Sequence, residues 1–389
     1  MPEQSFQIPV ARPIMDEREV EAVRRPIMAG WVTQGPEVAA FEREFAAYVG
    51  AEHACAVCNC TTALHLALLA VGVRPGDEVI TVSHSFIATA NSIHYCGAKP
   101  IFVDVQPATY NLDPKRIEEA ITPRARAILA VHQMGMPCDL KAIKAIADHR
   151  CLPLVEDAAC AIGSEINWNG SWEKIGKPHG HVACFSFHPR KVITTGDGGM
   201  LTTCNPEWDQ QFRLYRQHGM SIPDTVRHSS SRVAFESYPM IGFNYRLTDI
   251  QAAVGREQIK RLPELIAVRR RLAERYRVLL ADIDGLDLPH EPAWARSNWQ
   301  SFCVRLPEHC DQRRIMQYLL DRGVSSRRGV MCAHRELPYQ DSRNGHLHES
   351  ESAQDRCIVL PLYPQMTEKE QNWVAQSLQS ACRVVSRAA

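Results

Sequence analysis

Short apolar runs alternate with amphipathic stretches between residues 50 and 200 of this chain. The runs are rich in β-branched and other apolar residues, which favours buried strands, and helical periodicity lies between them, as at Leu140–Asp148. Strands that alternate with helices indicate a mostly parallel sheet with helices on both faces, an α/β fold. The predicted strands are Ala54–Val57, Glu78–Val82, Pro100–Val105, Ala127–Val131, Leu152–Val155, Val182–Phe187 and Met200–Thr203.

Outside this region the pattern predicts helices at Glu17–Met28 and Val38–Tyr48, and a long helix from Ile250 to about Leu280. We expect the long helix to connect a large domain, residues 1–250, to a smaller C-terminal α/β domain, residues 251–389. The polar segments 221–238 and 341–351 are predicted to be loops.

Composition narrows the class of protein. The 44 basic and 44 acidic residues give a formal charge of +0, which argues against a nucleic-acid binder. No apolar run reaches the roughly 18 residues of a membrane span, and Met1–Ile8 has no signal-peptide core. The 14 scattered cysteines suit a cytoplasmic protein with reduced thiols. Cys55, Cys58 and Cys60 lack a second cysteine pair at zinc-ribbon spacing, so we expect no metal site.

A lysine directly after an apolar strand is the main candidate for chemistry. Lys191 ends the run Phe185–Lys191, and the Gly-rich stretch Thr194–Gly199 follows. Shielding from water disfavours the charged form of a lysine and makes the amine a better nucleophile toward an aldehyde. This is what a Schiff base with pyridoxal 5′-phosphate (PLP) requires. The alternative is an ordinary surface lysine.

Three upstream features favour the cofactor interpretation. Asp157 ends a predicted strand, where it could pair with the pyridine nitrogen of PLP or simply cap a helix. Thr61 and Thr62 open a predicted helix whose free N–H groups could bind a phosphate, although Thr-capped helices are common. Phe86 follows another strand and could stack on a flat ring or belong to the core.

Together these motifs resemble the DegT/DnrJ (StrS-like) family of PLP-dependent sugar aminotransferases. The resemblance covers almost the whole chain, and the lysine motif with the Asn-Tyr-Arg and Gln-Ala-Ala motifs is its most specific part. The matching segments are Gly30–Pro36, Asn59–Leu68, Phe86–Asn91, Glu156–Ala159, Phe185–Gly199, His218–Met220, Gly242–Thr248, Gln251–Ala253 and Leu360–Pro364.

The resemblance implies the fold and the cofactor site. The fold is the type I fold of PLP-dependent aminotransferases, with a mostly parallel seven-stranded sheet in the large domain and a smaller C-terminal α/β domain. Lys191 would form the Schiff base and carry the proton, Asp157 would hold the pyridine nitrogen, and Phe86 would stack on the ring.

The resemblance also implies how the phosphate is held. Cys60 and Thr61 would bind it through backbone N–H groups and Ser186 through its hydroxyl. Asn244 would reach the phosphate of the other subunit, so the enzyme would be a homodimer with shared active sites. The alternative is that Asn244 caps the following helix within its own chain.

The sequence departs from the family pattern near the cofactor. Many relatives have Gly at Cys60, and Gln or His at Cys160, close to the phenolic oxygen or the lysine. Because Cys160 stands there, the resemblance does not fix how polar the surroundings of the cofactor are at this position. Relatives that dehydrate sugars carry His at the lysine position, so Lys191 favours amino transfer.

Six further residues are candidates for substrate binding. His132 could line the pocket or be a buried structural histidine, and His188 could instead support the lysine loop. Arg327 and His334 could contact a charged or hydroxylated substrate, although exposed arginines are usually solvated. The set is Thr33, His132, His188, Arg246, Arg327 and His334.

The sequence thus predicts a PLP-dependent transaminase that moves an amino group from an amino acid, expected to be L-glutamate, to a nucleotide-linked keto sugar. We expect no nucleic-acid or membrane partner. One alternative is an aminotransferase for a non-nucleotide ketone such as an inosose. Another is a non-catalytic regulatory homologue, which should have lost Lys191 or Asp157, whereas both are present.

Overall fold

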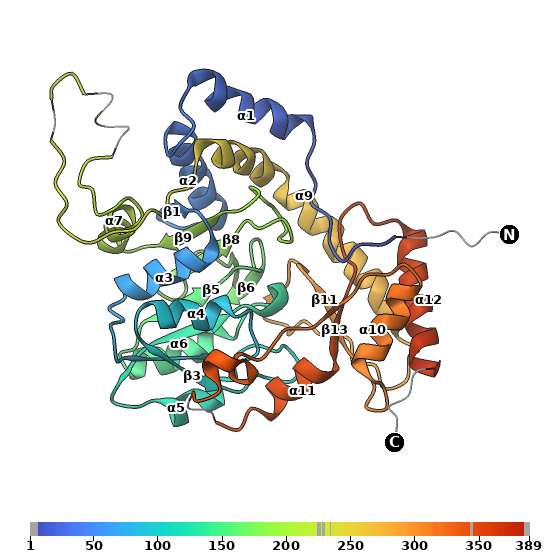
Figure 1. Cartoon of the computed structure of the whole chain (residues 1–389). Coiled ribbons are helices and arrows are strands. Elements are labelled where there is room, and N and C mark those ends of the chain that lie inside the picture. The colour runs from blue at the N-terminus through green and yellow to red at the C-terminus, as the bar shows by residue number, and fades with distance from the viewer. Residues whose placement is uncertain (1–6, 224–226, 228–229, 234, 343–344, 385–389) are drawn as a thin grey trace.

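The computed structural model describes residues 7–223, 227, 230–233, 235–342 and 345–384. Figure 1 shows a large α/β body and a smaller C-terminal unit, and the long helix α9 (Asp249–Leu280) runs from one to the other. No helix among these residues is long and apolar enough to cross a membrane.

The large body is built on a seven-stranded sheet with the order β1-β9-β8-β5-β4-β2-β3. Among the described strands of this sheet only β9 runs antiparallel to its neighbours. All seven predicted strands are therefore confirmed, with ends shifted by at most two residues. Their bounds are β1 His53–Val57, β2 Glu78–Val82, β3 Lys99–Val103, β4 Ala125–Val131, β5 Leu154–Asp157, β8 Val182–Ser186 and β9 Gly199–Thr203.

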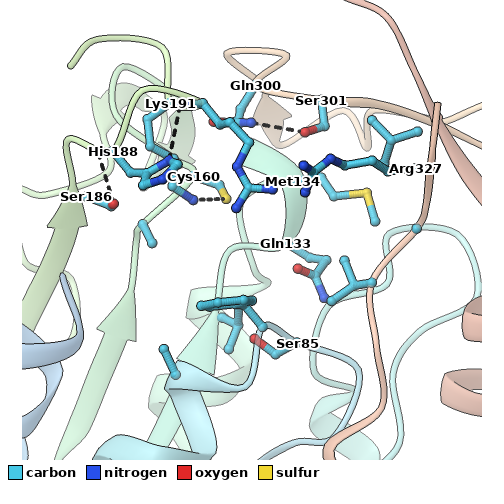
Figure 2. A pocket seen from close by; sticks show the side chains of 18 of the residues that line it. Ser85, Gln133, Met134, Cys160, Ser186, His188, Lys191, Gln300, Ser301 and Arg327 are labelled. Atoms are coloured by element: carbon cyan, nitrogen blue, oxygen red, sulfur yellow. Dashed lines mark hydrogen bonds between the residues drawn. The ribbon is translucent and has the colours of Figure 1, made fainter. Parts of the chain in front are cut away.

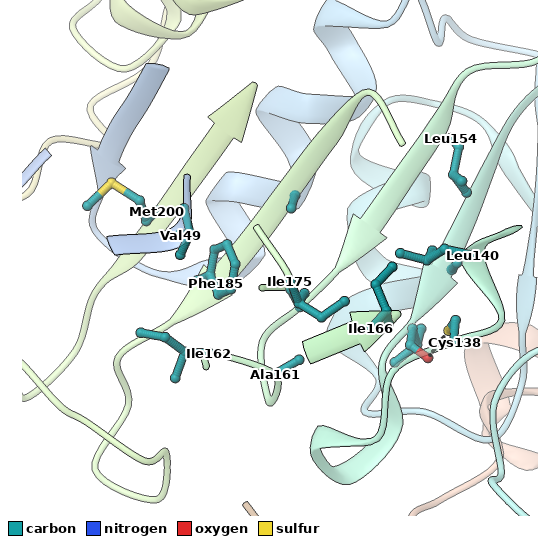
Figure 3. Close-up of a cluster of buried hydrophobic side chains, with 14 of the residues drawn as sticks. Val49, Cys138, Leu140, Leu154, Ala161, Ile162, Ile166, Ile175, Phe185 and Met200 are labelled. Carbon is teal, nitrogen blue, oxygen red and sulfur yellow. Dashed lines mark hydrogen bonds between the residues drawn. The ribbon is translucent and has the colours of Figure 1, made fainter. Parts of the chain in front are cut away.

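Both faces of the sheet are buried, as the continuous apolar runs predict. In β1, Ala54 and Ala56 pack into one core, and Cys55 and Val57 pack into the core on the opposite face. Figure 3 shows part of the first core, where Phe185, Met200 and other apolar side chains meet. The first face is covered by α2 (Pro36–Val49), α6 (Leu140–His149) and the start of α9; the second is covered by α3 (Cys60–Ala70), α4 (Ala88–Tyr95) and α7 (Pro206–Tyr215).

Helix α9 belongs to both units. Thr248 caps its N-terminus in a capping box with Gln251. Ile259 to Ile266 contribute to the core of the large body, whereas Ala273, Tyr276 and Leu280 belong to the C-terminal core. Helix α1 (Glu17–Ala29) packs against α9.

The C-terminal unit contains a three-stranded antiparallel sheet with helices packed around it. Its strands have the order β11-β13-β12. Ile8, near the other end of the chain, is buried in this unit and pairs with Val324. The N-terminal segment around Ile8 therefore packs with the C-terminal unit. A domain boundary at residue 250 remains a proposal. The elements are β11 Phe302–Arg305, α10 Gln312–Asp321, β12 Arg327–Arg328, β13 Cys357–Leu360 and α12 Glu368–Val384.

One predicted loop is partly wrong. Helix α11 (His348–Arg356) begins inside the segment 341–351, because Asp104 caps it from a distance. The Asp104 carboxylate accepts hydrogen bonds from the backbone N–H groups of Glu349 (2.9 Å) and Ser350 (2.8 Å). The other predicted loop, 221–238, lies partly outside the described residues. The remaining elements are α5 Ile117–Ala120, β6 Glu165–Trp168, β7 Ser171–Lys174 and β10 Ala295–Arg296.

Candidate active site

A cleft of about 940 Å³ lies between the carboxyl ends of the sheet strands and the C-terminal unit. This edge of an open α/β sheet is where ligands commonly bind. Side chains from the segments that follow β2, β4, β5 and β8 form one wall, as Figure 2 shows for Ser85, Gln133, Cys160 and Ser186. The segment 326–331 and residues of β13 form the opposite wall.

Lys191 lines this cleft on the loop that follows β8. Its backbone N–H donates to the His188 carbonyl (2.8 Å), and its Nζ donates to the Sγ of Cys160 (3.1 Å; Figure 2). Burial lowers the pKa of Lys191, but the neighbouring Cys160 and the Asp157 carboxylate outweigh burial, and the pKa lies above its ordinary value. The expectation that shielding from water lowers the pKa of this amine is therefore wrong, because the sulfur and carboxylate groups around it favour its charged form.

Asp157, at the end of β5, is buried and lines the same cleft. Its Oδ2 accepts from the Thr89 hydroxyl (2.8 Å), which also hydrogen-bonds the Ser85 hydroxyl (2.8 Å), and its Oδ1 accepts from the N–H of Ala159 (3.2 Å). Burial raises the pKa of Asp157, and the Thr89 hydrogen bond opposes this shift. The chain Ser85–Thr89–Asp157 thus holds a carboxylate in one orientation at the base of the cleft.

The start of α3 also opens into the cleft, at Cys60 and Thr61. Asn59 caps the helix by accepting from the N–H of Thr62 (2.9 Å), and the first-turn N–H groups of Cys60 and Thr61 have no partner within the helix. Gly199 packs against this turn so closely that an added Cβ would lie 2.4 Å from the Asn59 carbonyl oxygen. The Thr62 hydroxyl donates to the Asn59 carbonyl (2.7 Å) and so supports the same turn.

The lysine loop is fixed at both of its ends. The Ser186 hydroxyl accepts from the N–H of His188 (3.4 Å), and His188 Nδ1 accepts from the N–H of Arg190 (3.2 Å). At the far end, the Gln251 amide of α9 donates to the Asp197 carbonyl (2.7 Å). His188 lines the cleft, but this contact shows a role in supporting the loop.

Phe86 lines the cleft with 63% of its surface exposed. It lies just before α4, on the same β2–α4 connection as Ser85. A large aromatic side chain left exposed at the edge of a pocket is suited to stack on a planar ligand.

His132 is at the cleft wall but is fully buried. Its Nδ1 accepts from the N–H of Cys138 (3.0 Å), and its Nε2 lies 3.1 Å from Glu156 Oε2, so the ring donates there. Both ring nitrogens have protein partners, which makes this a positioning histidine in the structure.

Four predicted residues do not line the cleft of this single chain. His334 bonds to the Ser83 hydroxyl (2.6 Å) and to Glu351 (3.0 Å), and so ties the C-terminal unit to the end of β2. The Thr33 carbonyl accepts from the start of α9, and Arg246 pairs with the end of β1. Asn244 is exposed.

Sequence reasoning missed several residues that the structure brings to the cleft. The sequence could have indicated Thr89, because Phe86 follows a strand end and Thr89 lies one helical turn after Phe86. The others on the C-terminal side carry no local pattern and are brought in by the packing of the two units. These additional lining residues include Ser85, Gln133, Met134, Arg190, Gln300 and Ser301.

Comparison with known proteins agrees with this geometry. The sequence profile of the DegT/DnrJ/EryC1/StrS aminotransferase family matches residues 13–379. The spore coat polysaccharide biosynthesis protein SpsC of Bacillus subtilis (strain 168) is 34% identical over 378 residues, which cover 95% of this chain and 96% of SpsC.

Solved structures are similar over nearly the whole chain. DesV of S. venezuelae, in complex with a ketimine intermediate, has a TM-score of 0.88 and 32% identity, covering 98% of this chain and 100% of DesV. DesI, in the presence of its TDP-sugar product, has a TM-score of 0.88 and 28% identity, covering 98% of this chain and 94% of DesI.

Proposed function

The chain belongs to the DegT/DnrJ/EryC1/StrS aminotransferase family, and from this premise we propose that it aminates the keto group of a nucleotide-activated sugar. L-glutamate is the expected amino donor, and PLP is the expected cofactor, bound at Lys191. The similarity to SpsC and to the TDP-sugar-binding DesI supports a sugar substrate.

One observation carries the proposal: Lys191 and Asp157 line a single cleft together with the start of α3. A primary amine, a buried carboxylate and free backbone N–H groups are the three kinds of group that a PLP site needs. Residues from the ends of β5 and β8 and from α3 supply them, although together they span more than 120 positions of the sequence.

The residues that line the cleft are of the types that the cofactor requires. Cys60, Thr61 and Ser186 would hold its phosphate, Asp157 its ring nitrogen, and Phe86 a face of the ring. Gly199 leaves the Asn59–Cys60 turn the space it needs. PLP, when bound, supplies an aldehyde that exchanges for an amino group and a ring that withdraws electrons.

Each protein group then has a definable task. Lys191 Nζ holds the cofactor and afterwards moves a proton at the reacting carbon, as a positioned general base and acid. The Asp157 carboxylate keeps the ring nitrogen protonated, and Thr89 keeps that carboxylate oriented. Cys160 lies 3.1 Å from the Lys191 amine and sets the position from which the amine acts.

The cofactor assignment is tested on purified protein. We expect a visible absorption band from bound PLP, and borohydride reduction should attach the cofactor to the peptide that contains Lys191. Lys191→Ala should abolish turnover while it retains PLP through the phosphate and ring contacts. Attachment to a different lysine would refute the assignment.

The acceptor is tested with a panel of nucleotide-linked keto sugars, with glutamate as donor and mass spectrometry as the readout. Gain of an amino group by at least one of them is the expected result. Amination of an inosose and of none of the nucleotide sugars would move the proposal to the alternative substrate class.

We further propose a homodimer in which Asn244 reaches the partner's phosphate site. Asn244 is exposed and does not line the cleft of its own chain. The segment before it carries exposed apolar side chains, with Phe235 at 88% and Ile241 at 89%, and extends away from the body in Figure 1. Exposed apolar side chains of this size favour burial against another protein surface, here a second copy.

Mixing two inactive variants tests the shared site. Lys191→Ala chains and Asn244→Ala chains are refolded together. If the sites are shared, a mixed dimer has one site with both lesions and one with neither, so activity returns. A mixture that stays inactive, or a fully active monomer, would show that Asn244 acts within its own chain.

A further inference from the structure

Three arginines line the same cleft as Lys191. Arg327 and Arg328 form β12 on the C-terminal wall, and Arg190 directly precedes the lysine. Figure 2 shows the Arg327 side chain extending from the C-terminal wall toward the side of the cleft that carries Lys191 and Cys160. The sheet pairing of β12 with β13, at Arg327–Val359 and Arg328–Ile358, fixes the backbone from which these side chains project.

The charge of these arginines is largely uncompensated. Within the described residues, Arg190 and Arg327 form no ion pair, and Arg328 lies 3.8 Å from Glu336. The charged side chains that line the cleft are four cations (the three arginines and Lys191) and two anions (Asp157 and Asp197), so four minus two leaves a net charge of +2. A cleft with this excess attracts an anionic ligand.

Polar atoms beside the arginines also lack partners. Gln300 Oε1 and Ser326 Oγ are buried, and neither has a hydrogen-bond partner in the part of the chain that the structure describes. Both residues line the cleft. An unsatisfied buried polar atom is unfavourable, and a hydroxylated ligand in the cleft would supply the missing hydrogen-bond partner.

We propose that Arg190, Arg327 and Arg328 bind the phosphate groups of the amino acceptor. The inference rests on the proposed function, and it assigns that substrate's anionic part to arginines from both walls of the site. A guanidinium binds phosphate oxygens through two parallel N–H groups, which fixes orientation as well as charge. Each phosphate of a nucleotide diphosphate sugar carries a negative charge, which the three guanidinium groups would neutralise.

The position of the arginines also suits this assignment. Arg327 and Arg328 project from the wall opposite the strand ends, so a bound phosphate would leave the sugar between this wall and Lys191. A cleft of about 940 Å³ is far larger than an amino-acid donor needs. The competing assignment, that the arginines hold the donor's carboxylates, is an outcome that the experiment separates.

The test measures binding to the PLP-loaded enzyme by calorimetry. The probes are UDP, dTDP, GDP, uridine, thymidine and inorganic pyrophosphate. The variants are Arg190→Gln, Arg327→Gln and Arg328→Gln, and the control is Arg271→Gln, which removes the same charge from an exposed position of α9 outside the cleft. Bound PLP and circular dichroism confirm that each variant is folded and loaded.

We expect at least one nucleoside diphosphate to bind, with an affinity that falls with salt, and the uncharged nucleosides to bind at least tenfold more weakly. Arg190→Gln and Arg327→Gln should each weaken the diphosphate by about tenfold to a hundredfold, the range of a charge-assisted hydrogen bond. Arg328→Gln should cost less, because Glu336 already offsets part of its charge. Arg271→Gln should bind as the parent does.

Diphosphate binding that is equal in the parent and in all three variants would overturn the proposal, as would a parent that binds none of the anions. If pyrophosphate binds as tightly as the nucleotides, the arginines still bind phosphate, but the nucleoside contributes nothing to affinity and the acceptor is a sugar phosphate. Conversion of the bound cofactor by glutamate is followed separately in its visible spectrum. If Arg327→Gln slowed this reaction with glutamate as much as it weakened diphosphate binding, the arginines would be assigned to the amino donor instead. Failure of the parent itself to react with glutamate would count against the proposed function and leave the binding result standing.

Discussion

Replacement of Thr89 by Val should slow amino transfer without removing any group that touches the reacting atoms. The Thr89 hydroxyl donates to Asp157 Oδ2 at 2.8 Å, and the whole contact is buried. Valine keeps the shape of the side chain but leaves a buried carboxylate oxygen with one donor fewer. Thr89→Ser is the matched control, since it keeps the hydroxyl.

The magnitude follows from the type of hydrogen bond. A bond to a charged group contributes about 1.5–3 kcal/mol, so its loss should reduce turnover by roughly tenfold to a hundredfold if the full energy reaches the transition state. The hydrogen bond opposes the effect of burial on the pKa of Asp157, so its removal raises that pKa further. The carboxylate would then take up a proton at higher pH, and the acid side of the pH profile for PLP binding should move to higher pH.

Two measurements check this reasoning. The rate at which glutamate converts the bound cofactor is followed by stopped-flow absorbance, and PLP affinity of the apoprotein is titrated between pH 5 and 9. Thr89→Ser should stay close to the parent in both. If Thr89→Val had the parent's rate and an unmoved acid limb, the Ser85–Thr89–Asp157 chain would have no role in holding the charged carboxylate.

Three further changes test other parts of the structure. Asp157→Asn removes the charge that keeps the ring nitrogen protonated, and turnover should fall at least about a hundredfold; near-normal rates would exclude that role. Burial would raise the pKa of Glu42, but Arg216 and Arg213 outweigh it and hold the pKa below its ordinary value. The stability that this carboxylate contributes is present above the ordinary carboxyl pKa of about 4.3 and is lost as the pH falls through the lower pKa of the folded protein. Urea melts should therefore show that Glu42→Gln lowers the free energy of unfolding by about 3–5 kcal/mol at pH 7, and by less in acid. Arg269, whose pKa burial lowers to about 10, donates to the carbonyls of Trp299, Gln300 and Leu362; Arg269→Met should lower the free energy of unfolding by about 3 kcal/mol, and the exposed Arg271→Met should change it little.

The sheet could be predicted because its strands are buried on both faces. A strand such as β1, with Ala54 and Ala56 in one core and Cys55 and Val57 in the other, must be apolar at every position. Helix α11 could not be predicted in the same way. Its N-terminal N–H groups are capped by Asp104, more than 240 positions away, so no local cap marks its start.

The charge of Lys191 shows a similar limit. Strand position predicts where Lys191 lies but not what surrounds its amine. Cys160 and Asp157 approach it from another strand and raise its pKa, so the burial argument alone gives the wrong direction. A prediction of pKa needs the partners that folding supplies as well as the burial.

The two walls of the cleft differ in how far the sequence predicts them. Parallel strands all end at one edge, so Asp157 and Phe86 could be assigned to one site from the sequence pattern, and the family resemblance added Ser186. Arg327 and Arg328 reach that site only because α9 carries the C-terminal sheet back over the strand ends, a placement set by cores on both halves of the helix. The first wall supplies the chemistry common to a sheet-edge cofactor site, whereas the second is positioned by packing between the two units. Substitutions on the second wall can therefore change which anion is bound while the lysine, the carboxylate and the fold remain in place.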